Sequence, residues 1–293
     1  MTGVAIQMRK LLVQLDADRL PSSFDRVVAY DAGADEVLSY GAVAEPDVEA
    51  LVHGAIFTRG PKDLKNTALF VGGSDTPAAE RLLEAARKAF FGPFRVSVLL
   101  DPNGCNTTAA AAVVKLVRAL GGEAKGRRAA VLAGTGPVGT RAAGMLLRLG
   151  AEVRITSRDP TRGSETAKLI GERFKGSVES VAVRRPADAQ DLLGWAELLL
   201  CAGPPGVAFL PRELWAGRPS LRAVADVNAV PPLGIAGVEA TDDGTLREGI
   251  PAFGALGIGG LKMKVHKAAV ARLFESNDLV LDAEQIYDIA AAL

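Results

Sequence analysis

The sequence predicts an α/β protein of two domains, each built on a parallel β-sheet. Strand-like apolar runs alternate with helix-like periods along most of the 293 residues, and this alternation implies parallel sheets that helices cover on both faces. A glycine-rich turn follows one strand, at residues 134–139, and the charged segment 123–128 before that strand is typical of a hinge. We therefore expect one domain of residues 1–122 with 262–293, and another of residues 123–261.

The first half of the chain contains four strands and four helices. Ser22 is the N-cap candidate of the first helix, Ser74 or Asp75 that of the third, and Asn106 or Thr107 that of the fourth. The expected strands are residues 11–15, 36–40, 67–71 and 95–100, and the expected helices are residues 22–30, 46–56, 77–91 and about 107–120.

The second half continues the alternation. Beyond residue 234 the chain is glycine-rich as far as Gly259 and Gly260, and a last helix is expected to begin near Leu261. The expected strands are residues 129–133, 152–156, 180–183, 197–201 and 223–227, and the other helices are residues 138–149 and 165–174.

Composition and charge exclude several classes of function. The 34 Lys and Arg residues balance the 34 Asp and Glu residues, so neither nucleic acid nor a membrane surface is an expected partner. Cys105 and Cys201 cannot form a disulfide framework, which predicts a cytoplasmic location. His53 and His266 lie far apart in the sequence, so no metal site is expected and histidine-based triads are disfavoured.

The glycine-rich turn has the pattern G-x-G-x-x-G, which comes directly after a strand and opens a helix. Gly134 permits the tight turn, Gly136 lets a pyrophosphate approach the backbone, and Gly139 lets the helix pack on the sheet. Together with Thr135, Pro137 and Val138, these glycines predict a Rossmann-type dinucleotide site. The alternative is a glycine-rich turn that binds no ligand.

The end of the next strand indicates which dinucleotide is bound. An acidic residue would contact the adenosine ribose of NAD here, but the strand ends in Thr156, Ser157 and Arg158. Ser157 and Arg158 can bind a 2′-phosphate, with Arg162 near in sequence, so NADP is the predicted cofactor. Asp159 follows directly and is the residue that argues against this assignment.

Three segments together, residues 100–108, 133–139 and 252–262, give the chain a resemblance to a known family. It resembles the NADP-dependent methylenetetrahydromethanopterin dehydrogenases, and most closely the form from methylotrophic bacteria that also accepts methylenetetrahydrofolate. The likeness runs from about Leu11 to Ala290 and includes residues 30–35, 91–96 and 228–234.

The resemblance implies a hydride transfer between methylene-tetrahydromethanopterin, or methylene-tetrahydrofolate, and NADP in one-carbon metabolism. A Rossmann-type domain would bind NADP, a second α/β domain would bind the pterin, and the active site would lie in the cleft between them. A homo-oligomer is also expected. The implied catalytic residues are Lys262 and Asp101, the substrate-binding residues are Phe24, Tyr30, Asp31, Asn103, Thr107, Thr108 and His266, and Ala202, Gly203 and Asn228 join the cofactor site.

Most of these residues also have a purely structural interpretation. Phe24 fits the buried face of a helix, while Asp101 and Asn103 suit an ordinary turn. Lys262 follows a glycine run at the expected helix start, where the helix dipole disfavours a cation, so it needs a substrate or Asp101 as partner; the alternative is a solvated lysine. His266, one turn later, could share that face or be buried in the core.

Other functions remain open. The related methylenetetrahydrofolate dehydrogenase/cyclohydrolases use a Tyr followed four residues later by Lys, but Tyr30, Tyr40 and Tyr287 are each followed at that distance by Ala. A cyclohydrolase activity is therefore disfavoured. One alternative is another NADP-dependent imine or carbonyl dehydrogenase, and a second is a non-catalytic NADP-binding regulatory protein.

Overall fold

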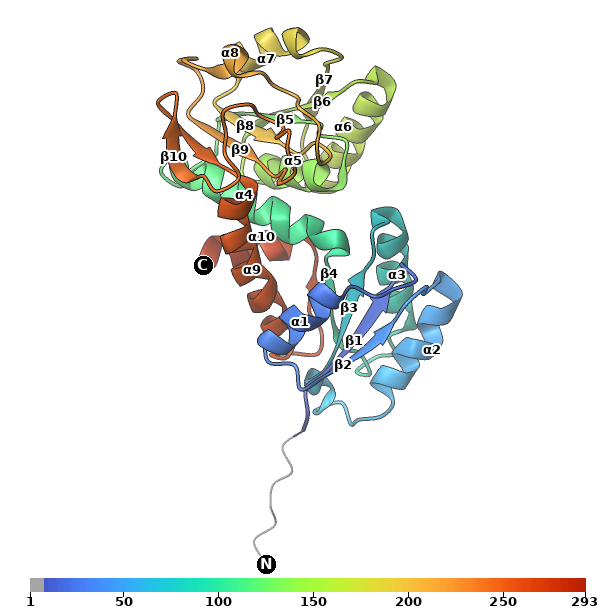
Figure 1. The fold of residues 1–293 in the computed structure, drawn as a ribbon. Helices are drawn as coiled ribbons and strands as arrows, with labels where there is room; N and C mark the ends of the chain where they lie inside the picture. Colours follow the sequence, from blue (N-terminus) through green and yellow to red (C-terminus); the bar gives the residue numbers. More distant parts are fainter. Residues whose placement is uncertain (1–7) are drawn as a thin grey trace, which may run out of the picture. The chain divides into compact units, whose positions relative to one another are not determined.

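The computed structural model describes residues 8–293, so residues 1–7 of the expected first domain lie outside the described residues. The chain divides into two compact units (Figure 1). The first unit combines the chain up to Asn106 with Met263–Leu293, and the second is Thr107–Lys262. The compact units differ from the expected domain ranges mainly in the segment 107–122.

The first unit holds a five-stranded sheet in the order β2-β1-β3-β4-β12, in which all strands run parallel. This is the flavodoxin-like order, in which the chain direction across the sheet reverses between the first and third strands. The strands are β1 (Leu11–Asp16), β2 (Glu36–Tyr40), β3 (Thr67–Gly72), β4 (Ser97–Leu100) and β12 (Val280–Leu281). The helices are α1 (Ser23–Asp31), α2 (Glu45–Ile56), α3 (Thr76–Ala89), α10 (Ala283–Ala292) and the second half of α9 (Ala255–Arg272).

Helices cover both faces of this sheet. Alternate strand residues such as Val13 and Val71 share one apolar core with α2 and α3, as the two-residue period of a strand requires. Phe70 points to the opposite face, where its ring stacks on His266 of α9 with the ring centroids 5.8 Å apart.

The second unit holds a seven-stranded sheet in the order β10-β11-β9-β8-β5-β6-β7. Without the antiparallel edge strand β10 this is the Rossmann order 3-2-1-4-5-6, with the reversal between β5 and β8. The strands are β5 (Arg128–Leu132), β6 (Glu152–Ser157), β7 (Val178–Ala182), β8 (Leu198–Cys201), β9 (Ala223–Asp226), β10 (Asp243–Arg247) and β11 (Ile250–Phe253). The helices are α4 (Cys105–Ala119), α5 (Pro137–Arg148), α6 (Pro160–Phe174), α7 (Gln190–Trp195), α8 (Arg212–Trp215) and the first half of α9.

The expected fold class and all nine expected strands are confirmed, with shifts of up to two residues at their ends. The cap assignment of the fourth helix is wrong, because α4 begins at Cys105 and both Asn106 and Thr107 lie inside it. The Asp101 carboxylate accepts the Asn106 N–H at 2.9 Å and so satisfies this helix start from further back in the chain. The sequence pattern did not predict the hairpin β10–β11, the short elements α7, α8 and β12, or the last helix α10.

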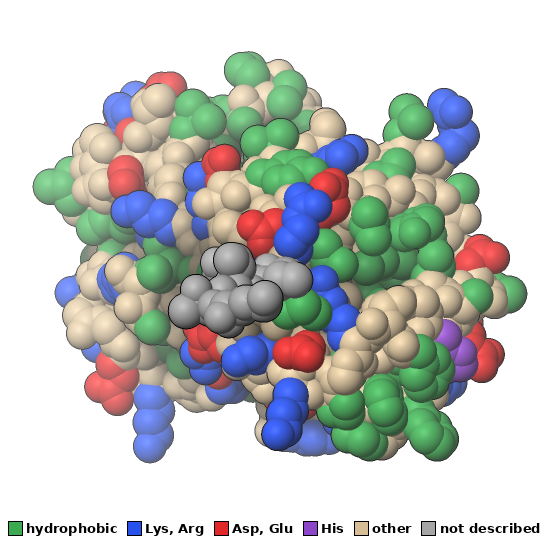
Figure 2. Space-filling model, turned by 90° about the horizontal axis from the view of Figure 1, so that it is seen from below, with side chains coloured by type: hydrophobic (Ala, Val, Ile, Leu, Met, Phe, Trp, Pro, Cys, Tyr) green, Lys and Arg blue, Asp and Glu red, His purple; other side chains and the backbone are tan. Residues whose placement is uncertain are grey.

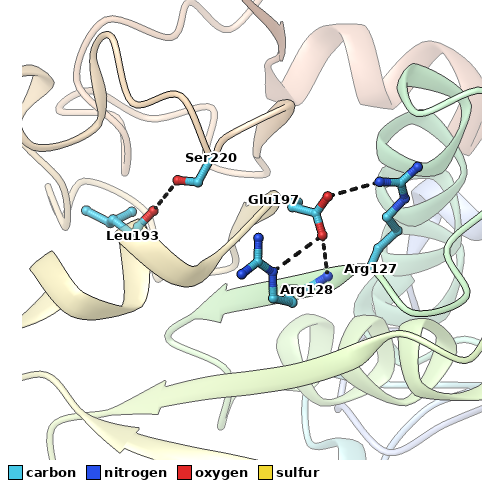
Figure 3. A network of polar contacts seen from close by, with 5 residues as sticks. All are labelled: Arg127, Arg128, Leu193, Glu197 and Ser220. Carbon is cyan, nitrogen blue, oxygen red and sulfur yellow. Dashed lines mark hydrogen bonds and ion pairs between the residues drawn. The ribbon is translucent and has the colours of Figure 1, made fainter.

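A partly buried carboxylate joins the amino ends of β5 and β8 (Figure 3). Glu197 accepts hydrogen bonds from the Arg127 guanidinium at 3.0 Å and the Arg128 N–H at 3.2 Å. Burial acts to raise the pKa of Glu197, but these bonds outweigh it and hold the pKa below its ordinary value. This network lies at the opposite end of the sheet from the glycine-rich turn, which follows the carboxyl end of β5.

On the face in Figure 2, Lys and Arg side chains are interspersed with Asp and Glu, and apolar side chains gather over part of the surface. One partly exposed aromatic cluster lies in the first unit. There the Phe57 ring is 5.1 Å from that of His53 and 5.7 Å from that of Phe94.

Of the helices in residues 8–293, none is long and apolar enough to span a membrane.

Candidate functional site

The glycine-rich turn after β5 is shaped by close backbone contacts in the second unit. A Cβ on Gly134 would lie 2.6 Å from the Cβ of Ile155, and one on Gly139 would lie 2.8 Å from the Cα of Gly134. Both distances are too short for real side chains, so packing alone requires glycine at these two positions. The first and third glycines of the motif therefore shape the fold, as the sequence analysis expected.

Gly136 differs from the other two glycines. A Cβ there would meet its nearest atoms, the carbonyl oxygens of Ala133 and Ala202, at 3.8 and 4.0 Å. Packing leaves room for a side chain, so the open backbone is available to a ligand. Gly136 is also the N-cap of α5, with no side chain capping the helix, and Pro137 follows as the first helical residue. A helix N-terminus with uncapped N–H groups is suited to bind phosphate.

The end of β6 lies beside this turn. Thr156 accepts the Ala133 N–H on its hydroxyl and the Gly134 N–H on its carbonyl, each at 3.0 Å. The buried Ser157 hydroxyl accepts the Asp159 N–H at 3.1 Å, whereas Arg158 is exposed. The Asp159 carboxylate caps α6 by accepting the Thr161 N–H at 2.9 Å. One oxygen of the residue that argued against NADP therefore caps its own helix.

The loops after β8 and β9 complete the carboxyl edge of the sheet. Ala202 donates its N–H to Leu132 at 3.1 Å, and Gly203 lies so close to the ring of Phe209 that a Cβ would overlap it. Asn228 is buried, and its side chain accepts the Val230 N–H at 2.8 Å. Its role in the structure is to hold this loop, and cofactor contact stays a prediction.

The sequence analysis did not single out Asp226, which anchors that loop. Its carboxylate accepts the N–H groups of Asn228 at 3.0 Å and Ile235 at 2.8 Å, and it is almost fully buried. Burial raises the pKa of Asp226, as it does the pKa of the neighbouring Cys201 thiol. An acidic residue that ends an otherwise apolar strand was the available signal.

Three of the expected substrate-binding residues lie on α1 in the first unit. Phe24 is 50% exposed, so the interpretation that it belongs to the core is wrong; its neighbour Val28 is the buried residue. The Tyr30 hydroxyl lies 3.4 Å from the Glu36 carboxylate. Asp31 forms an ion pair with Lys267 of α9 at 2.8 Å. An exposed aromatic ring on a fixed helix is available for stacking.

The loop after β4 forms a tight turn before α4. Asp101 is fully buried, and its carbonyl accepts the Gly104 N–H at 3.1 Å. Asn103 is exposed and holds a left-handed conformation with φ of +50°, which Asn tolerates better than most residues. Thr107 is fully buried and Thr108 partly buried, both within α4. The burial of Asp101 suits a residue that shapes the turn.

His266 is fully buried in the first unit, which fits the structural alternative. Its Nε2 lies 3.8 Å from the Asp25 carboxylate of α1, and its ring lies between those of Phe70 and Phe24. Sequence reasoning missed Asp25, whose position on a helix face among apolar residues gave no signal of this pairing. A role of His266 in substrate binding stays a prediction.

The argument that placed Lys262 at a helix start is wrong. Helix α9 begins at Ala255, so Lys262 lies about two turns inside it, beyond the turn over which the helix dipole acts. The preceding glycines are not a flexible loop. Gly254 and Gly257 lie against the backbone carbonyls of Glu239 and Asp242, where a Cβ would overlap the oxygen atoms. Lys262 is partly buried, and its catalytic role stays a prediction.

The structure gathers the expected cofactor residues at one edge of the second unit and sets most of the expected pterin residues in the first unit. Thr107, Thr108 and Lys262 fall within the second unit. Among residues 8–293, no group of three His, Cys, Asp or Glu side chains could hold a metal ion.

Comparison with known proteins identifies relatives along the whole chain. A family described as "Methylene-tetrahydromethanopterin dehydrogenase, N-terminal" matches residues 23–103. The chain is 50% identical over 282 residues to "Bifunctional protein MdtA" of Methylorubrum extorquens, covering 96% of this chain and 98% of the relative. It is 33% identical over 293 residues to the "NAD(P)-dependent methylenetetrahydromethanopterin dehydrogenase" of the same organism, with coverage of 97% and 99%.

Solved structures show the same fold at low sequence identity. Quinate dehydrogenase from Corynebacterium glutamicum in complex with NAD has a TM-score of 0.53 at 13% identity, covering 97% of this chain and 99% of that one. Shikimate 5-dehydrogenase from Listeria monocytogenes, in complex with shikimate and NAD, has a TM-score of 0.52 at 13% identity, with 96% of each chain covered.

The fold and the glycine-rich turn at the carboxyl edge of its second sheet define a Rossmann-type protein. Within that class, the chain belongs to the methylenetetrahydromethanopterin dehydrogenase family of one-carbon metabolism.

Proposed function

We propose that this protein transfers a hydride from the methylene carbon of methylene-tetrahydromethanopterin, and of methylene-tetrahydrofolate, to NADP. The observation that carries the proposal is the 33% identity over nearly the full length with a relative named as an NAD(P)-dependent methylenetetrahydromethanopterin dehydrogenase. The open backbone at Gly136 supports it, because a dinucleotide needs such a phosphate cradle.

The reaction needs little acid–base chemistry from the protein. The methylene carbon lies between two nitrogens, whose lone pairs spread the positive charge that remains when the hydride leaves. NADP, when bound, supplies the ring carbon that accepts the hydride. The protein then has to hold the two carbons roughly 3–3.5 Å apart and to surround the developing cation with fixed dipoles. This requirement is met by binding residues and does not call for a nucleophile.

The preference for NADP rests on the end of β6. Asp159 is the acidic residue that would bind the ribose hydroxyls of NAD, and one oxygen of its carboxylate accepts the N–H groups of Thr161 and Arg162 at the start of α6. Arg158 is exposed beside it and can form a charge-assisted hydrogen bond with a 2′-phosphate. We assign Arg158 this role.

On the pterin side, we assign Phe24 to stacking against the bicyclic ring, since half of its surface is exposed. Asp101 is fully buried, so its side chain is not exposed at the surface. We assign it to holding the turn that carries Asn103. Lys262 is assigned to contact the pterin, where its cation can bind a carbonyl or carboxylate oxygen.

The test is the formation of NADPH when the purified protein meets NADP and each methylene-tetrahydropterin, with NAD measured in parallel. Arg158→Ala should raise the KM for NADP and leave the KM for NAD unchanged. Arg185→Ala is the matched control, because Arg185 is exposed but paired with Asp188 at 3.2 Å.

Two results would favour the other functions. Binding of NADP without turnover of either pterin would favour a regulatory protein, and turnover of simple imines or carbonyls alone would favour a different dehydrogenase.

We also propose a cytoplasmic location and a homo-oligomeric assembly. Cys105 and Cys201 are both buried and neither forms a disulfide, which suits a reducing compartment. Light scattering on the purified protein tests the assembly, and a monomer mass would contradict it; fractionation of the source cells tests the location.

A further inference from the structure

Ala133 has an unusual backbone conformation at the start of the glycine-rich turn. Its φ is +52°, in the left-handed region that is unfavourable for a residue with a Cβ. Such strain persists only where the surroundings hold the residue in place, and it occurs preferentially at ligand sites. What holds Ala133 therefore bears on how the turn binds its ligand.

The main constraint comes from Thr156 on the neighbouring strand β6. Its hydroxyl accepts the Ala133 N–H and its carbonyl accepts the Gly134 N–H, each at 3.0 Å. Thr156 is 4% exposed, so no bulk water competes for these bonds. On the other side of the residue, the Ala133 carbonyl accepts the Gly136 N–H at 3.3 Å. Ala133 thus links β6 directly to the backbone of Gly136, where the pyrophosphate is proposed to bind.

We propose that Thr156 is a positioning residue for the dinucleotide: its hydroxyl holds Ala133 in the left-handed conformation and so keeps the turn in the shape that binds the pyrophosphate. The inference rests on the proposed cofactor site at Gly136. Thr156 itself need not touch the cofactor.

The mechanism is preorganisation. Without the hydroxyl, the Ala133 N–H loses its buried partner, and the strained residue relaxes toward an ordinary conformation. The fraction of molecules with a binding-competent turn then falls, and the apparent Kd rises by the reciprocal of that fraction. The chemical step, once both substrates are bound, is unchanged.

Thr156→Val removes the hydroxyl and keeps the side-chain shape, while Thr156→Ser keeps the hydroxyl. The valine variant should raise the Kd for NADP about five-fold, the effect of one hydrogen bond, with kcat and the KM for the pterin unchanged. The serine variant should bind like the wild type. Thr156→Ala carries the same expectation as valine if the valine variant does not fold.

Thr166→Val is the matched control. Its hydroxyl also forms a hydrogen bond with the backbone, here as the donor to the Arg162 carbonyl at 2.8 Å on the exposed side of α6. This variant should leave the Kd for NADP unchanged. An equal rise in Kd for the two valine variants would reduce Thr156 to a general structural role.

Ala133→Gly gives an independent test, because glycine adopts a positive φ without strain. In the Thr156→Val background it should return the Kd for NADP most of the way to the wild-type value. The inference is overturned if Thr156→Val binds NADP like the wild type. It is also overturned if the change in the Kd for NADP in the double variant is the product of the changes that Thr156→Val and Ala133→Gly cause separately. A wild-type protein that binds no dinucleotide would overturn the proposed function as well.

Discussion

Substitution of Gly136 separates binding from folding more cleanly than any other change in the glycine-rich turn. A Cβ at this position has no neighbour closer than 3.8 Å. Its φ of −83° and ψ of 169° are extended values that valine adopts readily. Gly136→Val should therefore fold, and yet its side chain would occupy the space where the pyrophosphate must approach the backbone.

The magnitude follows from two contributions. The loss of a favourable N-cap residue costs about 1 kcal/mol at most, which lowers the Tm by about 2–4 °C in a protein of this size. The loss of the phosphate contacts should raise the Kd for NADP at least about 100-fold, which corresponds to about 2.7 kcal/mol, within the range of about 1.5–3 kcal/mol for one hydrogen bond to a charged group. The effect on binding thus exceeds the effect on stability.

Gly134→Ala is the matched control within the same turn. Its Cβ would lie 2.6 Å from the Cβ of Ile155 and 3.0 Å from the carbonyl oxygen of Val131. Overpacking of this kind costs about 1–3 kcal/mol, so the Tm should fall further than in Gly136→Val. Calorimetry gives the Tm of each variant, and isothermal titration gives the Kd for NADP. If Gly136→Val bound NADP within three-fold of the wild type, the turn would not be the phosphate cradle.

Three other substitutions test separate parts of the account. Arg158→Ala should raise the KM for NADP about ten-fold and leave that for NAD unchanged; equal effects in steady-state assays with the two cofactors would remove the assignment. Lys262→Ala should lower kcat/KM for the pterin at unchanged NADP affinity, and unaltered turnover would return Lys262 to a structural role. Glu197→Gln should lower stability by about 1–3 kcal/mol at neutral pH without changing activity. The pKa of Glu197 in the folded protein lies below its ordinary value. Its contribution to the free energy of unfolding is therefore complete at pH values above the ordinary pKa, and it is lost as the pH falls through the lowered pKa of the folded protein. In thermal melts, the difference in Tm between the wild type and Glu197→Gln should therefore shrink in acid. A difference in Tm that does not change with pH would contradict this.

Most strands of the second unit were predictable from the sequence because they are short runs bounded by helical or turn segments, whereas the hairpin β10–β11 and the short helices α7 and α8 gave no such pattern. The turn at residues 134–139 could be placed as well, since a strand precedes it and a helix follows. What periodicity could not reveal is why each glycine is there. Gly254 and Gly257 fall in the glycine-rich stretch expected to precede the last helix, but they allow α9 to lie against backbone carbonyls. Such close approach depends on tertiary packing, which no local pattern encodes.

Site residues were harder to predict than elements for the same reason. Thr156 acts through hydrogen bonds to backbone that is remote in sequence, so it carries no local signal. The local sign of Asp226 is an acidic residue that ends an apolar strand, and this does not reveal which N–H groups its carboxylate accepts. The structural interpretation of Phe24 as a buried residue was wrong, because a helix face rich in apolar residues does not reveal which of them a sheet covers. The family resemblance supplied the pterin-side candidates, and the structure places them without testing their roles.

The most direct test of direct hydride transfer uses methylene-tetrahydrofolate with deuterium on its methylene carbon. After turnover with NADP, nuclear magnetic resonance of the product should show one deuterium at C4 of the nicotinamide ring. NADPH without deuterium at that carbon would contradict the account.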